Sequence, residues 1–142
     1  MIIALVQLAT ISVAQQAITE SGVVFGIHES GLNIYKGVPF AAPPIGDLRW
    51  RPPIRVAPWT GSRKADAFAP ACMQSGVSMP GETPPTISED CLYLNIWSPT
   101  EAGAKAEANA KTNTAQSRLP VFVWIYGGGY TNGSASMPMY WG

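Results

Sequence analysis

The feature that most constrains this chain is an apolar run that ends in three consecutive glycines. Residues 121–126 are all β-branched or aromatic, and Gly127, Gly128 and Gly129 follow them directly. Such a run predicts a strand buried on both faces of a sheet. The glycines allow backbone angles that other residues avoid, and they let N–H groups approach a ligand without a Cβ in the way.

This layout is typical of an oxyanion hole, in which a strand delivers a glycine loop that faces developing negative charge. Two other glycine motifs fit less well. A dinucleotide-binding fingerprint needs a third glycine where Asn132 stands, and a phosphate-binding NTPase loop needs a lysine where Ser134 stands. A plain glycine-rich turn after a core strand fits this stretch as well as an oxyanion hole does.

The charge balance excludes one broad class of function. Charged residues make up 13% of the 142 residues, and nine basic side chains cancel nine acidic ones. No basic stripe can neutralise phosphates, so we expect no nucleic-acid partner. The 13 prolines and 14 glycines predict long, turn-rich connections rather than helices.

The amino terminus resembles an export signal. Residues 2–9 are almost wholly apolar, and Ser12 and Ala14 are small residues at the spacing that a signal peptidase reads. We therefore expect a signal peptide over residues 1–17 and a secreted or periplasmic protein. No later apolar run reaches transmembrane length. Residues 100–118 are alanine-rich and polar, and we expect a low-complexity insertion there.

The two cysteines, Cys72 and Cys91, favour one disulfide in an exporting compartment, with two unrelated buried thiols as the alternative. The single histidine, His28, is far from both in sequence, and there is no Cys-x-x-Cys spacing. The sequence therefore predicts no metal site. Nothing in it points to a cofactor.

The rest of the chain predicts strands and loops. Residues 22–27 and 32–38 are short apolar runs that predict an antiparallel hairpin joined by residues 28–31, with Gly31 relieving the turn and His28 in solvent at its tip. The prolines of residues 40–53 predict an extended loop. Residues 92–97 alternate and predict another strand. Residues 61–70 fit no element clearly.

Three motifs in order carry a family resemblance. They are residues 37–44 (GVPFAAPP), 88–95 (SEDCLYLN) and 124–130 (WIYGGGY). Together they resemble the amino-terminal part of type-B carboxylesterases, in the carboxylesterase/cholinesterase branch of the α/β-hydrolases. The resemblance covers residues 21–140, and the second motif is the most specific. It implies the α/β-hydrolase fold, here an accessory β-hairpin and the first strands of a large mixed sheet, within a domain over residues 18–142.

The resemblance also implies roles for individual residues. Gly128 and Gly129 would supply two backbone N–H donors of the oxyanion hole, and Gly127 would shape the loop. Cys72 and Cys91 would form the first disulfide loop of the family. The substrate would be a small-molecule carboxylic ester. The loop between the cysteines contains no aromatic residue, which disfavours a choline-ester specialist.

A third implied pair is Arg49 and Glu89, which would tie the proline-rich loop to the strand after Cys91. If this ion pair is buried, removing one partner would cost about 3–5 kcal/mol. The adjacent carboxylates of Glu89 and Asp90 are expected to face opposite ways, so they are not read as an acid–base pair.

The sequence departs from the family pattern in its catalytic triad. No Gly-x-Ser-x-Gly occurs, and His28 precedes the glycine loop instead of following it. We therefore expect this chain to be a fragment of an ester hydrolase. The fragment contains the oxyanion loop but not the nucleophile, the acid or the histidine of the catalytic triad. Without the elements that cover the strand, Phe122, Trp124 and Ile125 would be partly exposed. The alternative is a catalytically silent, neuroligin-like adhesion protein of the same superfamily. The three intact glycines favour the enzyme over the adhesion protein. The sequence does not indicate an oligomeric state.

Overall fold

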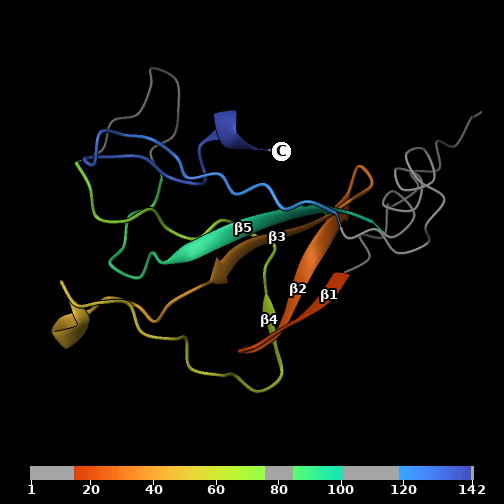
Figure 1. The fold of residues 1–142 in the computed structure, drawn as a ribbon, viewed down its shortest axis with the longest axis horizontal. Coiled ribbons are helices and arrows are strands. Elements are labelled where there is room, and N and C mark those ends of the chain that lie inside the picture. Colours follow the sequence, from red (N-terminus) through yellow and green to blue (C-terminus); the bar gives the residue numbers. More distant parts are fainter. Residues whose placement is uncertain (1–14, 76–84, 101–118, 142) are drawn as a thin grey trace, which may run out of the picture.

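The computed structural model describes residues 15–75, 85–100 and 119–141, which form one small unit built on β-strands (Figure 1). The strands are β1 (Gln15–Thr19), β2 (Gly22–Glu29), β3 (Leu32–Pro39), β4 (Ser62–Lys64) and β5 (Tyr93–Pro99). They pair in the order β1-β2-β3-β5, and β4 also pairs with β2. Helical structure in the described ranges is limited to two 3-10 turns, η1 (Gly46–Leu48) and η2 (Pro138–Tyr140).

β2 and β3 form the hairpin that the sequence predicts. They pair antiparallel, with Glu29 opposite Leu32. The connecting residues Ser30 and Gly31 have φ values of 51° and 79°. Two positive φ angles in a two-residue connection are typical of a type I′ turn, whose twist matches that of the strands it joins. Gly31 therefore relieves the turn, as predicted.

β1 and β4 both pair with the first half of β2. Ala17 of β1 is antiparallel to Val24, and Arg63 of β4 is parallel to the same residue. β1 begins at Gln15, so residues 15–17 of the predicted export signal are part of the sheet; residues 1–14 lie outside the described residues. The predicted insertion is described only at Thr100, its first residue.

β5 pairs antiparallel with β3, and the pairing contains a bulge. The register runs from Leu32 opposite Pro99 to Pro39 opposite Tyr93, and it shifts between Tyr35 and Val38. At the shift Gly37 has a φ of 68°, and its N–H donates to the Asn95 side-chain oxygen at 2.9 Å. A glycine with positive φ in one strand is a usual means of accommodating an extra residue.

The core lies between the hairpin and β4. Its buried members are Val24, Tyr35, Val38 and Ala65, and Trp59 packs against them. The Trp59 indole N–H donates to the Val23 carbonyl at 2.9 Å, which satisfies the one polar group of a half-buried side chain. This small core fixes the sheet on which the glycine loop depends.

The prediction of a buried strand at residues 121–126 is wrong for this chain. The structure assigns no strand there, and Phe122 and Ile125 are each 84% exposed while Trp124 is 60% exposed. The physical reason is that none of the described strands pairs with this segment. Its aromatic side chains make ring contacts only with one another and with Tyr140, with 5.7 Å between the centroids of Trp124 and Tyr140, among the described residues. The expected exposure of these three residues is confirmed.

The proline-rich segment 40–53 is the loop that the sequence predicts, apart from η1. Near the end of this loop, Trp50 has a φ of 59° and a fully exposed side chain. No helix of the described ranges is long and apolar enough to cross a bilayer.

Candidate oxyanion loop

The three glycines form a tight turn after the exposed apolar run. Gly128 has a φ of 139° and Gly129 a φ of 60°. A Cβ added at Gly128 would lie 1.7 Å from the Asn132 carbonyl oxygen, whereas one added at Gly127 or Gly129 would meet nothing within 4 Å. Gly128 is therefore the position at which the turn cannot accept a side chain.

One carbonyl closes this turn. The Gly128 carbonyl oxygen accepts from the N–H groups of Thr131 and Asn132 at 3.1 and 3.2 Å, and from the Thr131 hydroxyl at 3.1 Å. The amide side of the turn differs, because the N–H groups of Gly128 and Gly129 donate no hydrogen bond to the described residues. Both glycines are exposed. The loop thus offers two free backbone donors on adjacent residues, which can stabilise an anion.

The segment after the glycines is anchored to the sheet at two points. The Asn95 side chain of β5 donates to the Ala135 carbonyl at 3.4 Å. Further along, the ring of Trp141 stacks on Phe68 with 5.5 Å between centroids, and the Lys36 ammonium of β3 lies 4.6 Å from the Phe68 centroid. These contacts fix the path of the chain beyond the loop.

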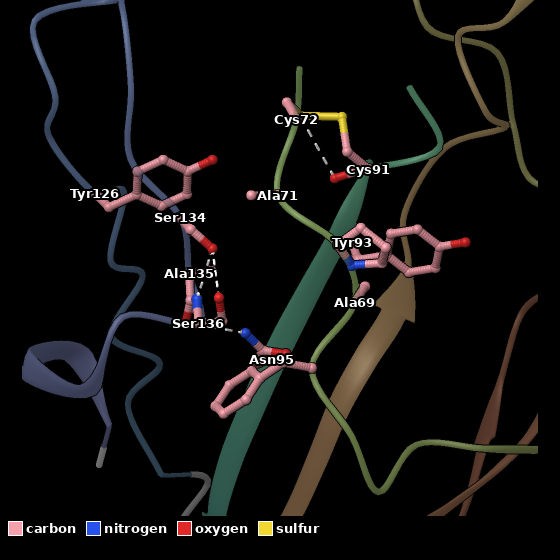
Figure 2. Close-up of a pocket in the computed structure, with 12 residues that line it drawn as sticks. Ala69, Ala71, Cys72, Cys91, Tyr93, Asn95, Tyr126, Ser134, Ala135 and Ser136 are labelled. Atoms are coloured by element: carbon pink, nitrogen blue, oxygen red, sulfur yellow. Dashed lines mark hydrogen bonds between the residues drawn. A yellow bond between two sulfur atoms is a disulfide. The ribbon is translucent and has the colours of Figure 1, made fainter. Parts of the chain in front are cut away.

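Cys72 and Cys91 are joined by a disulfide with a Cα–Cα distance of 5.0 Å. The disulfide lies across a small cavity from Tyr126 and Ser134 (Figure 2). Ser134 is buried, and its hydroxyl lies 2.6 Å from that of Ser136. The cavity encloses about 30 Å³, which is space for one water molecule rather than for an ester. Residues of the disulfide region and of the glycine-loop segment thus line one cavity, which is too small to hold an ester.

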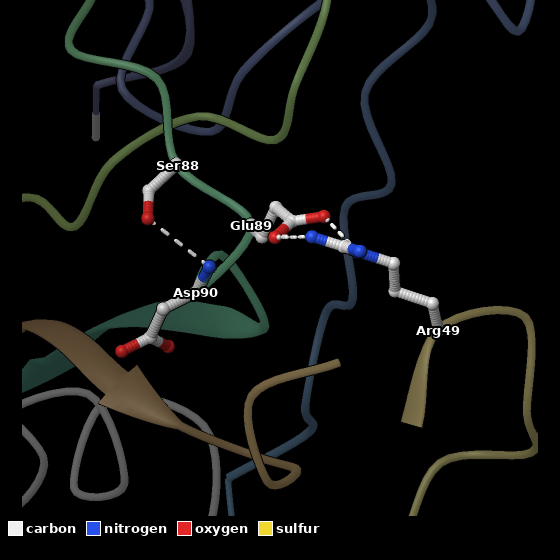
Figure 3. A network of polar contacts seen from close by, with 4 residues as sticks. All are labelled: Arg49, Ser88, Glu89 and Asp90. Carbon is white, nitrogen blue, oxygen red and sulfur yellow. Dashed lines mark hydrogen bonds and ion pairs between the residues drawn. The ribbon is translucent and has the colours of Figure 1, made fainter. Parts of the chain in front are cut away.

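Arg49 and Glu89 form a bidentate ion pair (Figure 3). The condition of burial is not met, because the two side chains are 55% and 36% exposed. The loss of about 3–5 kcal/mol that we expected on removing one partner of a buried pair therefore does not apply, because solvent screens exposed charges. The hydrogen bond from Arg49 holds the pKa of the Glu89 carboxyl below its ordinary value, and Glu89 raises the pKa of Arg49.

The carboxylate of Asp90 points away from Glu89 (Figure 3). The Asp90 N–H donates to the Ser88 hydroxyl oxygen at 3.1 Å. Burial raises the pKa of the Tyr93 hydroxyl, and its hydrogen bond with the Asp90 carboxylate is a second, smaller cause in the same direction. The two neighbouring carboxylates thus have separate structural roles, as predicted.

The expected place of His28 at the tip of the hairpin is wrong, because strand pairing continues to Glu29 and includes His28 opposite Asn33. The His28 side chain is exposed, as expected, and its ring lies 3.3 Å from the Asn33 side-chain oxygen. Among the described residues, no three His, Cys, Asp or Glu side chains lie close enough together to hold a metal ion.

Sequence reasoning missed two side chains that hold the loop, Gln74 and Asn95. The Gln74 amide contacts the backbone of Gly133, 59 residues away in sequence. An isolated glutamine in a proline- and glycine-rich stretch gives no local signal of such a contact. Asn95 lies within the most specific motif, and a polar residue at that place in a strand was a usable signal for a structural hydrogen bond.

A known protein family matches this chain over most of its length. The sequence profile described as "Carboxylesterase family" matches residues 13–142. This chain belongs to the carboxylesterase family. Among curated members, it is 44% identical to the fumonisin B1 esterase of Sphingopyxis macrogoltabida over 122 residues. It is 40% identical to the phenmedipham hydrolase of Pseudarthrobacter oxydans over 129 residues.

Solved structures of family members show the same fold. A PNB esterase structure matches with a TM-score of 0.74 and 34% identity, over 89% of this chain and 24% of that one. The fold is thus the α/β-hydrolase fold, represented here by its amino-terminal part, in which every strand pair but β2–β4 is antiparallel among the described residues. The alignments with these two curated relatives cover 86% of this chain and 20% and 23% of the relatives. The chain therefore spans about a fifth to a quarter of the length of these relatives.

Proposed function

We propose that this chain is the amino-terminal part of a carboxylic ester hydrolase and contributes its oxyanion loop. The observation that carries the proposal is the glycine turn, where two exposed N–H groups have no partner among the described residues. Membership of the carboxylesterase family supports it. The N–H groups of Gly128 and Gly129 would bind the oxygen of a tetrahedral intermediate.

In this mechanism the chain supplies electrostatic stabilisation, and other parts of the polypeptide supply the nucleophile and the proton transfers. A serine attacks the ester carbonyl, the alcohol leaves, and water hydrolyses the acyl-enzyme. During each half-reaction the carbonyl oxygen gains negative charge, which the two glycine donors would offset. Losing one such donor typically lowers the rate by about 10²–10³.

The substrate we propose is a small carboxylic ester without a quaternary ammonium group. The segment between Cys72 and Cys91 contains no aromatic side chain that could bind such a cation. Relatives named as a fumonisin B1 esterase and a cocaine esterase are consistent with a general ester hydrolase.

We also propose that the protein is exported by means of an amino-terminal signal peptide. The Cys72–Cys91 disulfide supports export, because such a bond is typical of an oxidising compartment.

The experiment that tests the proposed function is to read the gene beyond the codon for Gly142 and to express its complete product. Hydrolysis of p-nitrophenyl esters, with a Gly-x-Ser-x-Gly serine whose replacement by alanine abolishes turnover, would support it. A continuing frame with that serine replaced by another residue, and no turnover, would refute it and favour the neuroligin-like alternative.

A further inference from the structure

The side chain of Gln74 pairs with both backbone groups of Gly133. The Gly133 N–H donates to the Gln74 side-chain oxygen at 2.8 Å, and the Gln74 side-chain nitrogen donates to the Gly133 carbonyl at 2.9 Å. A single primary amide thus reproduces the two-bond pairing of neighbouring strands. It holds Gly133 in both position and orientation, because two hydrogen bonds to one residue fix its peptide planes.

Gln74 is itself held by the disulfide region. Its side-chain nitrogen also donates to the Cys72 carbonyl at 3.0 Å, and Cys72 is bonded to Cys91, two residues before β5. The Gln74 amide therefore makes three hydrogen bonds and is half-buried. A side chain fixed in this way can hold Gly133 at a constant position relative to Cys72.

Gly133 in turn packs directly against the glycine turn. A Cβ placed at Gly133 would lie 2.6 Å from the Gly127 carbonyl oxygen and 2.9 Å from the Tyr126 ring. Its neighbour Asn132 presents its carbonyl to Gly128 in the same close way. The stretch that Gln74 holds is therefore the surface against which the glycine turn is formed.

We infer that Gln74 is a positioning residue for the oxyanion loop, acting through Gly133 on the N–H groups of Gly128 and Gly129. The catalytic consequence of this inference rests on the proposed function. Its structural part, that Gln74 holds the turn, is independent of that function. The side-chain hydrogen bonds of Gln74 within the described residues go to Gly133 and Cys72 and not to Gly128 or Gly129, so its effect on the loop is indirect. Its role is to hold the stretch against which the glycine turn is formed.

The structural part is tested on the 142-residue chain by hydrogen–deuterium exchange and mass spectrometry, at low micromolar concentration. In Gln74→Ala, exchange at Gly133 is expected to rise about two- to tenfold, which corresponds to the loss of one hydrogen bond. The decisive readout is the N–H groups of Thr131 and Asn132, which donate to the Gly128 carbonyl. These should also exchange faster, although Gln74 does not touch them.

The matched control is Gln16→Ala, which removes an exposed glutamine side chain on β1. It should leave exchange at residues 131–133 unchanged. If Gln74→Ala accelerates exchange at Gly133 alone, the glutamine holds its own partner and not the turn, and the inference is wrong.

A second variant, Gln74→Glu, covers the case in which the alanine variant does not fold. The new carboxyl can accept from the Gly133 N–H, but when ionised it faces the carbonyl oxygens of Gly133 and Cys72. Exchange at residues 131–133, corrected for its intrinsic pH dependence, should therefore rise as the pH passes through the carboxyl pKa. A corrected rate that does not change with pH would overturn the inference.

The catalytic part is tested in the complete polypeptide. Gln74→Ala is expected to lower kcat about ten- to a hundredfold with little change in KM, because a misplaced donor weakens stabilisation made only in the transition state. If the Gln16→Ala enzyme hydrolyses esters and Gln74→Ala matches its kcat, the inference fails while the proposed function stands. If Gln16→Ala shows no ester hydrolysis but the exchange effect is present, the proposed function fails instead.

Discussion

Replacing Gly128 with alanine is the sharpest test of the glycine turn. With a φ of +139°, Gly128 lies in a region that other residues rarely adopt, and its added Cβ would lie 1.7 Å from the Asn132 carbonyl oxygen. The backbone angle alone costs about 1–3 kcal/mol for a non-glycine residue. Relieving the overlap requires the turn to open, which breaks two backbone hydrogen bonds to the Gly128 carbonyl at about 1 kcal/mol each. We therefore expect a loss of about 3–5 kcal/mol of local stability.

The neighbouring glycines provide matched controls because an added Cβ would meet nothing at either of them. Gly127 has no positive φ, so Gly127→Ala is expected to change the free energy of unfolding by less than about 1 kcal/mol, in either direction. Gly129 has a φ of +60°, a left-handed angle that costs about 1–2 kcal/mol for alanine. The expected order of destabilisation is Gly128, then Gly129, then Gly127.

The assay is urea unfolding of the complete polypeptide, followed by tryptophan fluorescence, with ester hydrolysis measured on the same samples. Gly128→Ala is expected to lower kcat/KM by about 10²–10³. The reasoning is refuted if Gly128→Ala is as stable as Gly127→Ala and exchange at Thr131 and Asn132 is unchanged in it. Such a result would mean that the turn does not depend on a glycine at this position.

Three further predictions concern the rest of the described chain. The exposed apolar segment 121–125 should make the isolated 142-residue chain self-associate, and Val123→Lys should reduce this association in gel filtration; a wild-type chain that stays monomeric with a sharp thermal transition would contradict the prediction. Removing the disulfide with Cys72→Ser should cost about 3 kcal/mol in urea unfolding, and a loss below about 1 kcal/mol would show that the loop is held by other contacts. The pKa of Glu89 is lower in the folded than in the unfolded chain, so its ion pair stabilises above about pH 4.3 and this contribution is lost as the pH falls through the folded-state pKa. The stability difference between wild type and Glu89→Gln should therefore shrink in acid, and a difference that does not vary with pH would count against the pair.

The sequence predicted those elements that depend on local chemistry. The hairpin of β2 and β3 follows from two apolar runs and from the glycine that its turn requires. β5 follows from an alternating pattern, and the loop at residues 40–53 from its prolines. In each case the residues themselves limit the backbone angles, so no distant contact is needed to make the prediction.

The sequence failed where a distant partner decides the structure. Residues 121–126 have the composition of a strand but no described strand pairs with them, so they stay exposed. β4 shows the opposite case, because the polar residues of Ser62–Lys64 form a strand only through backbone pairing with β2. For the site, the glycine motif indicated the loop. The support from Gln74 was invisible, because a hydrogen bond over 59 residues leaves no local pattern.

The bulge in β3 has a consequence for how chains of this kind can vary in length. Side chains alternate between the faces of a regular strand, so Tyr35 and Val38, three residues apart, would face opposite ways without the bulge. The extra residue keeps both of them in the core, opposite Ile96 and Leu94. A residue deleted from β3 on either side of the bulge would therefore exchange the faces of the strand beyond it, whereas one deleted at the bulge would leave Val38 opposite Leu94. Insertions and deletions among related chains should therefore collect in the loops or at the bulge. Gly37 thereby fixes the position of Asn95, because its N–H donates to the Asn95 side-chain oxygen. The same side chain donates to the Ala135 carbonyl, so the bulge also helps to place the segment that follows the glycine turn.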